Sequence, residues 1–286
     1  CKKIISPAMN TNMFFNSIVQ ENIEKLKRHG YEIIEPAVGM LANRDIGAGR
    51  MPDEDVLFDY VVKEAAYQKD LEGMNVLVTA GHTVEAIDPV RYISNHSTGK
   101  MGYALAKAAS LRGAETTLVS GPTALLKPRF AACVDIVSAE DMFREVTERA
   151  PKQDVVIKAA AVADYRPAQV SREKMKKKDG ELSIPLVRTR DILAYLGRNK
   201  KEGQFLCGFS METEHMLEYS REKLEKKNLD MIVANNLRQQ GAGFGTDTNV
   251  VTILTKDGEV SLPQMSKDEV AHRILDQILK IKNGCR

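Results

Sequence analysis

The chain has 286 residues with 41 basic and 39 acidic side chains, and the formal net charge of +2 gives no electrostatic argument for binding to nucleic acid or to a membrane. Apolar residues make up 43% and charged residues 28%, as in an ordinary soluble globular protein, and the length suffices for one large or two modest domains. No apolar run approaches the roughly 20 residues that span a bilayer, and no signal peptide is visible.

The cysteines at positions 1, 133, 207 and 285 lie far apart and form no C-x-x-C pair. This spacing predicts a reducing compartment, the cytoplasm, and no zinc site. The chain begins at Cys1, without a methionine, inside a stretch that reads as a strand. We therefore expect the sequence to be a piece of a longer polypeptide.

The beginning of the chain predicts a small α/β segment. Its expected elements are a strand at residues 3–5, a helix at about 17–29, a strand at 31–35, a flap, and a helix at about 52–68. The charged run at 69–73 is typical of a linker. We therefore expect two domains, residues 1–70 and residues 71–286.

The rest of the chain alternates between apolar strands and amphipathic helices. Strands are expected at residues 75–79, 115–120, 155–160, 205–209 and 230–234, and helices at about 101–112, 139–150, 191–198 and 212–227. Strands rich in Val, Ile and Ala that alternate with helices predict a Rossmann-like, doubly wound α/β fold with a mainly parallel sheet. Residues 250–254 and 259–262 predict a β-hairpin with an Asp-Gly turn. A closing helix is expected from Ser266, as its N-cap, to about residue 282.

The loop at residues 88–102, DPVRYISNHSTGKMG, follows the 75–79 strand and leads into a helix that opens on small residues and glycines. Unpaired backbone N–H groups at such a helix start form an anion site. The loop is not a Walker A motif, because Ser94 stands in place of the first glycine and Met101 in place of the Ser/Thr that holds the metal. No G-x-G-x-x-G follows the strand, which argues against a dinucleotide site. A tight turn with solvated charges is the alternative.

Three motifs occur together: the 88–102 loop, AAAVADYRP at 159–167 and EKMKK at 173–177. In this order they closely resemble phosphopantothenate–cysteine ligase, which in bacteria is usually fused behind phosphopantothenoylcysteine decarboxylase. The resemblance runs from about Gly73 to the end of the chain. It implies that 4′-phosphopantothenate, L-cysteine and CTP are joined through an acyl-cytidylate, with Mg²⁺ or Mn²⁺, in a homodimer formed by the ligase domain. For the full-length protein it implies a higher homo-oligomer.

The resemblance implies a role for two residues of the loop. Asn95 matches the asparagine that stabilises the intermediate, and an uncharged amide can polarise the acyl carbonyl without trapping a carboxylate product. The alternative is an asparagine that caps the turn at Ser97 and Thr98. Arg91 matches an arginine that reaches the substrate from the neighbouring subunit, and its alternative is a surface salt bridge.

The second motif ends a predicted strand, where small side chains let backbone amides approach a ligand closely. By resemblance, Lys158, Ala159 and Ala160 contact the nucleotide, and Ala160 and Ala161 contact the substrate. Asp164 matches the aspartate near the nucleotide and its metal. A helix N-cap or an ordinary loop aspartate is the alternative for Asp164.

The remaining nucleotide contacts also come from the resemblance. Lys174 matches the lysine of a flexible K-x-K-K strap, here residues 174–178, that closes over the site and completes the reaction. Without the resemblance this run would read as a solvated loop. Phe209, Lys223 and Lys227 match contacts to the cytidine nucleotide, and a helix places the two lysines, four residues apart, on one face. Arg190, Asp191, Ile192 and Leu193 match a nucleotide-contacting turn, from which Arg190 departs because proline is usual there.

Residues 6–13 and 39–51 resemble the P-x-M-N-x-x-M motif and the flap of the fused decarboxylase. Asn10 matches an asparagine that contacts the substrate. Asn43 stands where a cysteine is expected as the proton donor, and an amide cannot donate a proton as a thiol does. FMN belongs only to the complete decarboxylase domain. We therefore expect this segment to bind no flavin and to release no carbon dioxide.

Two other functions remain open from the residues alone. The first is a nucleotide-binding Rossmann-type module such as an NAD(P)-linked reductase, although the missing glycines and the lysine strap argue against it. The second is a catalytically dead scaffold, and the intact Asn95, Asp164 and Lys174 argue against that.

Overall fold

The computed structural model of the protein describes residues 1–176, 182–212, 216–236 and 245–284. The chain divides into two compact units, an N-terminal unit, Cys1–Lys69, and a C-terminal unit, Asp70–Arg286. None of the helices in the described ranges combines the length and the apolar character that a bilayer crossing requires.

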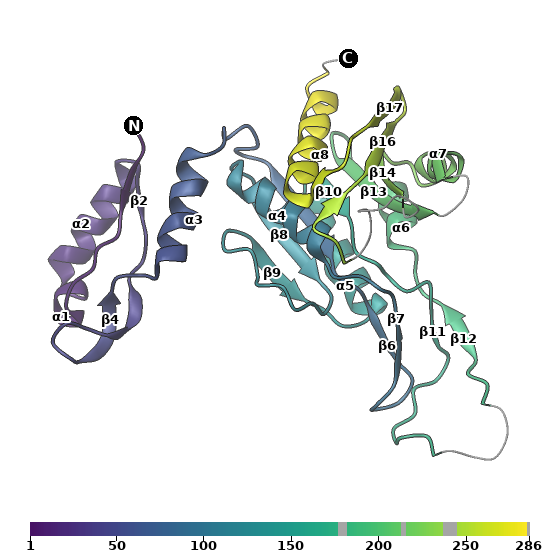
Figure 1. Cartoon of the computed structure of the whole chain (residues 1–286), viewed down its shortest axis with the longest axis horizontal. Helices are drawn as coiled ribbons and strands as arrows, with labels where there is room; N and C mark the ends of the chain where they lie inside the picture. Colours follow the sequence, from purple (N-terminus) through teal and green to yellow (C-terminus); the bar gives the residue numbers. More distant parts are fainter. Residues whose placement is uncertain (177–181, 213–215, 237–244, 285–286) are drawn as a thin grey trace. The chain divides into compact units, whose positions relative to one another are not determined.

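The N-terminal unit is a small α/β segment with a short parallel strand pair and a hairpin (Figure 1). Its elements are β1 (Lys3–Ile5), α1 (Thr11–Phe14), α2 (Ser17–Arg28), β2 (Tyr31–Ile33), β3 (Ala37–Met40), β4 (Ile46–Arg50) and α3 (Glu54–Ala65). The buried side chains of Phe14, Ile23 and Ile33 form its core. The expected strand–helix–strand start is therefore confirmed, and the flap is the antiparallel β3–β4 hairpin.

The C-terminal unit is built on an eight-stranded sheet in the order β17-β16-β14-β13-β10-β5-β8-β9. The strands are β5 (Asn75–Ala80), β8 (Glu115–Ser120), β9 (Ala132–Asp135), β10 (Val155–Lys158), β13 (Phe205–Glu212), β14 (Met231–Asn236), β16 (Val251–Thr255) and β17 (Gly258–Ser261). All neighbours from β14 to β9 pair in parallel, and the β16–β17 hairpin is antiparallel. This confirms the predicted mainly parallel α/β fold with a hairpin near the C-terminus.

Helices pack against both faces of this sheet. One face carries α4 (Lys100–Leu111) and α8 (Lys267–Lys282), and the other carries α5 (Ala139–Arg149), α6 (Ile192–Arg198) and α7 (Met216–Lys226) (Figure 1). Successive residues of β5 alternate between the two cores: Val76 and Val78 join the first, and Leu77 joins the second. Since strand side chains alternate in direction, a strand buried on both faces needs a continuous apolar run.

The end of the chain follows its local signals. Ser266 is the N-cap of α8, and its hydroxyl accepts from the N–H of Glu269. The Glu269 carboxylate accepts in return from the N–H of Ser266, which completes a capping box.

The helix expected at 212–227 is described from Met216, where α7 begins. Residues 213–215 lie outside the described ranges.

The sequence did not predict the short strands of the C-terminal unit. These are β9 and three antiparallel pairs, β6 (Val84–Ala86) with β7 (Tyr92–Ser94), β11 (Tyr165–Pro167) with β12 (Leu186–Arg188), and β15 (Thr248–Asn249) with β18 (Met265–Ser266). Strands of two to four residues that are partly exposed carry too few residues to display an apolar period. The loop at 88–102 therefore begins in a small hairpin rather than running irregularly from strand to helix.

The connections of the sheet create a switch point. From β5 the chain passes through α4 to β8 on one side, and β10 lies on the other side of β5. The loops that leave β5 and β10 thus diverge above the carboxyl ends of two adjacent strands. In open α/β sheets this is the place where ligands bind.

Candidate active site

A cavity of about 470 Å³ lies along the carboxyl ends of β5, β10, β13 and β14. Its lining combines the start of α4, the segment that follows β10, and single residues of α7, β15 and α8. The lining residues are Asn95, His96, Ser97, Thr98, Gly99, Lys100, Met101, Gly102, Lys158, Ala159, Ala160, Ala161, Val162, Asp164, Phe209, Ser210, Met211, Lys223, Asn235, Asn249 and Lys267.

Two glycines set the position of the α4 start. Gly99, the residue before the helix, has a φ of 79°, a left-handed conformation that favours glycine. A Cβ on Gly102 would stand 2.5 Å from the Cβ of Ala80 and 2.8 Å from the carbonyl oxygen of Thr79. The first turn of α4 can therefore lie directly on the end of β5, with its N–H groups at the cavity.

Asn95 follows β7 and is exposed at the rim of the cavity. In the described part of the chain its side chain has no hydrogen-bond partner. The turn is held by other groups: Ser97 Oγ accepts from the N–H of Gly99 at 3.3 Å, and the Ser97 carbonyl contacts His82 Nδ1 at 2.9 Å. The alternative of a turn-capping asparagine is therefore not what the structure shows.

Arg91 is not among the residues that line the cavity. Its guanidinium donates to the carboxylate of Asp88 through Nε at 3.0 Å and Nη2 at 2.5 Å, and Nη2 also contacts the carbonyl of Met175 at 3.1 Å. Asp88 is 2% exposed, and the Arg91 guanidinium holds the pKa of this carboxyl well below its usual range. Within this chain Arg91 thus makes the ion pair that was its alternative interpretation.

The described part of the strap is also hydrogen-bonded to Asp88. The N–H of Met175 donates to the Asp88 carboxylate at 3.2 Å, and the N–H of Ser171 donates to the carbonyl of Ile87 at 2.9 Å. Lys174 is exposed and does not line the cavity. Lys177 and Lys178, the end of the predicted K-x-K-K element, lie outside the described ranges.

The N–H groups of Ala160 and Ala161 are engaged within the chain, and the contact of the alanine run with a ligand stays a prediction. The Ala160 N–H donates to Thr79 Oγ1 at 3.1 Å, and the Ala161 N–H donates to the carbonyl of Gly81 at 2.9 Å. These bonds tie the loop after β10 to the loop after β5. The small side chains of Ala159, Ala160 and Ala161 still line the cavity and leave room in it.

Asp164 is exposed at the cavity and is followed by the strand β11, so the helix N-cap alternative does not apply. Lys158, the last residue of β10, also faces this cavity. Burial, and then the positive charge of Lys227, lower the pKa of Lys158 to about 8, although Asp191 and Asp164 act in the opposite direction. The site thus holds a lysine whose charge changes close to neutral pH.

Lys223 of α7 and Phe209 of β13 line the cavity, whereas Lys227 does not. Lys227 Nζ pairs with Asp191 at 2.8 Å, and Asp191 caps α6 by accepting from the N–H of Ala194 at 3.0 Å. Lys227 directly follows α7, and the two lysines have different environments, one at the cavity and one in a structural ion pair.

Residues 190–193 are not among those that line the cavity, and their predicted contact with a nucleotide stays a prediction. Ile192 and Leu193 are core residues, 1% and 5% exposed, so their side chains do not face the cavity. Arg190 pairs with Glu140, and its guanidinium carbon lies 3.7 Å from the centroid of the Phe143 ring. The departure from proline at this position is thus accounted for by a local ion pair and ring contact.

The sequence reasoning missed Asn235, Asn249 and Lys267. Asn235 is 4% exposed, and its Oδ1 has no hydrogen-bond partner in the described part of the chain. A buried amide without a partner is costly, so an unpaired amide at a cavity points to a ligand. The available signal was a polar residue at the carboxyl end of the apolar β14 strand.

A second cavity, about 380 Å³, lies within the N-terminal unit and brings Asn10 and Asn43 together with residues 8–9, 40–42 and 49–51. Both asparagines are engaged locally. Asn10 caps α1 by accepting from the N–H of Asn12 at 2.9 Å, and Asn43 Nδ2 donates to the Asp45 carboxylate at 2.6 Å.

Two family profiles divide the chain between them. One, described as DNA/pantothenate metabolism flavoprotein C-terminal domain, matches residues 71–281, and one described as Flavoprotein matches residues 1–66.

Curated relatives match nearly the whole chain. The coenzyme A biosynthesis bifunctional protein CoaBC of Bacillus subtilis is 48% identical over 278 residues, which cover 96% of this chain and 68% of that protein. The protein of the same name from Haemophilus influenzae is 42% identical over 276 residues, covering 96% and 69%.

Among solved structures, the C-terminal domain of a coenzyme A biosynthesis bifunctional protein CoaBC superposes with a TM-score of 0.66 at 45% identity, covering 76% of this chain and 100% of that one. A Cab2 mutant in complex with phosphopantothenate-cysteine has a TM-score of 0.62 at 15% identity, covering 82% and 96%, a likeness of fold.

Proposed function

The chain belongs to the family of the coenzyme A biosynthesis bifunctional proteins CoaBC, and we propose that its C-terminal unit is a CTP-dependent phosphopantothenate–cysteine ligase. The observation that supports this most is the convergence in one cavity of an unpaired amide, Asn95, a helix start, and the side chains of Lys158, Asp164 and Lys223. These are the groups that activation of a carboxylate by a nucleotide requires.

In the first half-reaction the carboxylate of 4′-phosphopantothenate attacks the α-phosphorus of CTP, and pyrophosphate leaves. Both reactants are anions, so positive charge must hold them together. The start of α4, Lys158 and Lys223 supply it on three sides of the cavity. We propose that Lys174 and Lys227 also contact the nucleotide once it is bound. Lys174 precedes Met175, whose N–H donates to the Asp88 carboxylate, and Lys227 pairs with Asp191.

In the second half-reaction the amine of L-cysteine attacks the acyl carbon of the acyl-cytidylate, and CMP leaves. Negative charge develops on the acyl oxygen. Asn95 lies at the cavity with its amide unpaired within the described ranges, and it can donate to that oxygen without forming an ion pair with a carboxylate product.

A divalent cation, Mg²⁺ or Mn²⁺, is proposed as the partner of the nucleotide. No cluster of three or more metal-ligating side chains is found among the described residues. Among the residues that the structure describes, Asp164 is the one that lines the cavity with a carboxylate, and this fits Mg²⁺, which proteins often bind through one or two carboxylates together with substrate phosphates. When bound, the ion would neutralise charge on the leaving pyrophosphate.

Two further proposals come from the family. A homodimer formed by the ligase unit would bring Arg91 of a neighbouring subunit to the substrate. FMN and decarboxylation belong to the complete decarboxylase domain of the relatives, of which the N-terminal unit here matches the flavoprotein profile at residues 1–66. An NAD(P)-linked reductase has no supporting observation, since no dinucleotide glycines follow β5.

The proposal is tested by pyrophosphate release. Release should require CTP, Mg²⁺ and 4′-phosphopantothenate together, and the addition of L-cysteine should then produce CMP and 4′-phosphopantothenoylcysteine. Parallel assays with ATP determine the nucleotide preference. If the complete mixture releases no pyrophosphate, the ligase proposal is wrong.

A further inference from the structure

Two lysines line both the active-site cavity and a neighbouring groove of about 420 Å³. They are Lys100, in the first turn of α4, and Lys267, in the first turn of α8. Lys100 Nζ contacts the Asp247 carboxylate at 2.7 Å and the carbonyl of Gly245 at 3.1 Å, and Lys267 Nζ donates to the carbonyl of Thr246. The short segment 245–247 thus holds both ammonium groups at the wall between the two spaces.

The partners of this ion pair lie in different environments. The side chain of Asp247 is 89% exposed and belongs to the groove alone, whereas that of Lys100 is 30% exposed and also faces the cavity. Lys267 is buried, and its burial, followed by the charge of Lys100, lowers its pKa. Exposed ion pairs contribute little to stability, so Lys100 can exchange Asp247 for another anion at low cost.

The starts of α4 and α8 differ in whether a side chain caps their first N–H groups. Ser266 and Glu269 cap α8 on both sides, so its first N–H groups are used. No side chain caps α4, which begins after the left-handed Gly99 and points its first N–H groups at the cavity. The buried Asn235 amide oxygen, unpartnered within the described residues, lines this cavity too. The cavity thus presents positive charge and unpaired polar groups to a ligand.

We propose that Lys100 and Lys267, with the start of α4, form a phosphate subsite, and that Asp247 holds Lys100 until the phosphate arrives. On binding, the ion pair of Lys100 with Asp247 breaks and an ion pair of Lys100 with the phosphate replaces it. The inference rests on the proposed function for the identity of the ligand. That function supplies two phosphates, those of the nucleoside triphosphate and the 4′-phosphate of phosphopantothenate.

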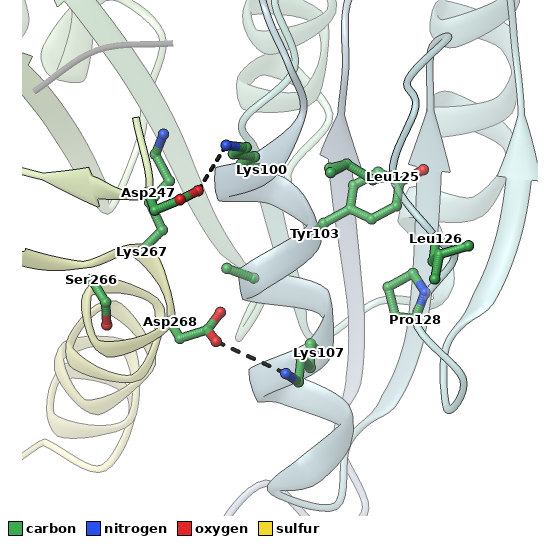
Figure 2. A pocket seen from close by; sticks show the side chains of 11 residues that line it. Lys100, Tyr103, Lys107, Leu125, Leu126, Pro128, Asp247, Ser266, Lys267 and Asp268 are labelled. Atoms are coloured by element: carbon green, nitrogen blue, oxygen red, sulfur yellow. Dashed lines mark hydrogen bonds and ion pairs between the residues drawn. The ribbon is translucent and has the colours of Figure 1, made fainter. Parts of the chain in front are cut away.

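A second lysine–aspartate pair in the groove provides a control for substitutions of Lys100 and Asp247. Lys107, further along α4, lies 3.9 Å from Asp268, and this pair lines the groove but not the cavity. Figure 2 shows both lysine–aspartate pairs bridging from α4 to the segment around the start of α8. Lys107→Met and Asp268→Asn therefore remove the same charges as Lys100→Met and Asp247→Asn without touching the proposed subsite.

The test is titration of the whole chain with CTP, CMP, 4′-phosphopantothenate and inorganic tripolyphosphate. Lys100→Met should weaken binding of one of the two substrates by about tenfold or more, the usual effect of losing a charged hydrogen bond. Asp247→Asn should tighten binding of the same ligand by about two- to fivefold, because the competing carboxylate is gone. Lys100→Arg should restore most of the affinity, and both control variants should match the parent.

The pattern of ligands identifies the source of the phosphate. Loss of affinity for CTP but not for CMP places the terminal phosphates at Lys100, and loss for 4′-phosphopantothenate places its 4′-phosphate there. Unchanged binding of both substrates to Lys100→Met, or equal effects of Asp247→Asn and Asp268→Asn, would overturn the subsite. Failure of the ligase proposal is distinguishable, because the parent protein itself would then show no ligase activity. In that case tripolyphosphate tests the subsite without a nucleoside. Equal binding of tripolyphosphate to the parent and to Lys100→Met would overturn the subsite.

Discussion

The cavity of the N-terminal unit and the active-site cavity of the C-terminal unit use the same kind of side chain in opposite ways. In the N-terminal unit, Asn10 caps a helix and Asn43 pairs with Asp45. In the C-terminal unit, Asn95 and the buried Oδ1 of Asn235 have no partner among the described residues. A polar group that is satisfied by its own chain stabilises structure, and one that is left unpaired at a cavity is available to a ligand. The comparison therefore supports the proposal that the C-terminal unit carries the ligase chemistry.

The largest expected effect comes from Asn95. Replacing it by aspartate puts a negative charge where the acyl oxyanion develops, so the second half-reaction should slow by about 10²–10³-fold, and the first half-reaction by less. The acyl-cytidylate should then accumulate and be detectable by mass spectrometry of quenched reactions. If no intermediate appears and substrate binding is simply lost, Asn95 maintains the turn and does not take part in the chemistry.

A smaller effect is expected from the pH dependence of Lys158. Because its pKa is about 8, its ammonium attracts the nucleotide below that pH. A bound phosphate raises the pKa of Lys158. The affinity for CTP is therefore full below the pKa of the free protein and falls as pH rises above it, by at most about tenfold per pH unit. Titrating CTP across this range should show the fall in the parent and not in Lys158→Met or Lys158→Arg. An unchanged pH profile in both variants would contradict the assignment.

Lys223 and Arg190 sharpen the comparison within the C-terminal unit. Lys223 lines the cavity, so Lys223→Met should raise the dissociation constant for CTP by about tenfold. Arg190 is engaged with Glu140 and Phe143, so Arg190→Ala should lower stability by about 0.5–1 kcal/mol and leave CTP affinity within about twofold of the parent. Calorimetric titration and thermal unfolding measure both quantities. A tenfold loss of affinity in Arg190→Ala would return this turn to the nucleotide site.

The smallest effect is expected in the N-terminal unit. Asn43→Ala should leave pyrophosphate release unchanged, since Asn43 belongs to a different unit from the ligase cavity. The parent should release no carbon dioxide from 4′-phosphopantothenoylcysteine, because an amide at position 43 cannot act as the proton donor. A bifunctional CoaBC relative is the positive control for that assay. Carbon dioxide release by the parent, or bound flavin after purification, would show that the N-terminal unit is active.

The sequence by itself determined the parts of the fold that repeat over many residues. The long apolar strands, the helices between them and the capping box at Ser266 all carry local signals, and each lies within a few residues of its predicted place. The motif loops were also placed correctly at strand ends, since connections at the carboxyl edge of a parallel sheet converge there. Eight of the expected site residues line one cavity: Asn95, Lys158, Ala159, Ala160, Ala161, Asp164, Phe209 and Lys223.

Only the tertiary structure decided which polar groups remain unpaired. Within the chain, Arg91 pairs with the buried carboxylate of Asp88, and the N–H of Ala160 donates to Thr79 Oγ1. Asn235 carried no motif at all, and its significance lies in an empty hydrogen-bonding position. Thr79 lies 81 residues before Ala160, and the burial of Asp88 and of Asn235 is likewise set by the packing of the whole unit. A local pattern can specify where a side chain lies along an element, but the partner that satisfies it is chosen by the packing of the whole unit.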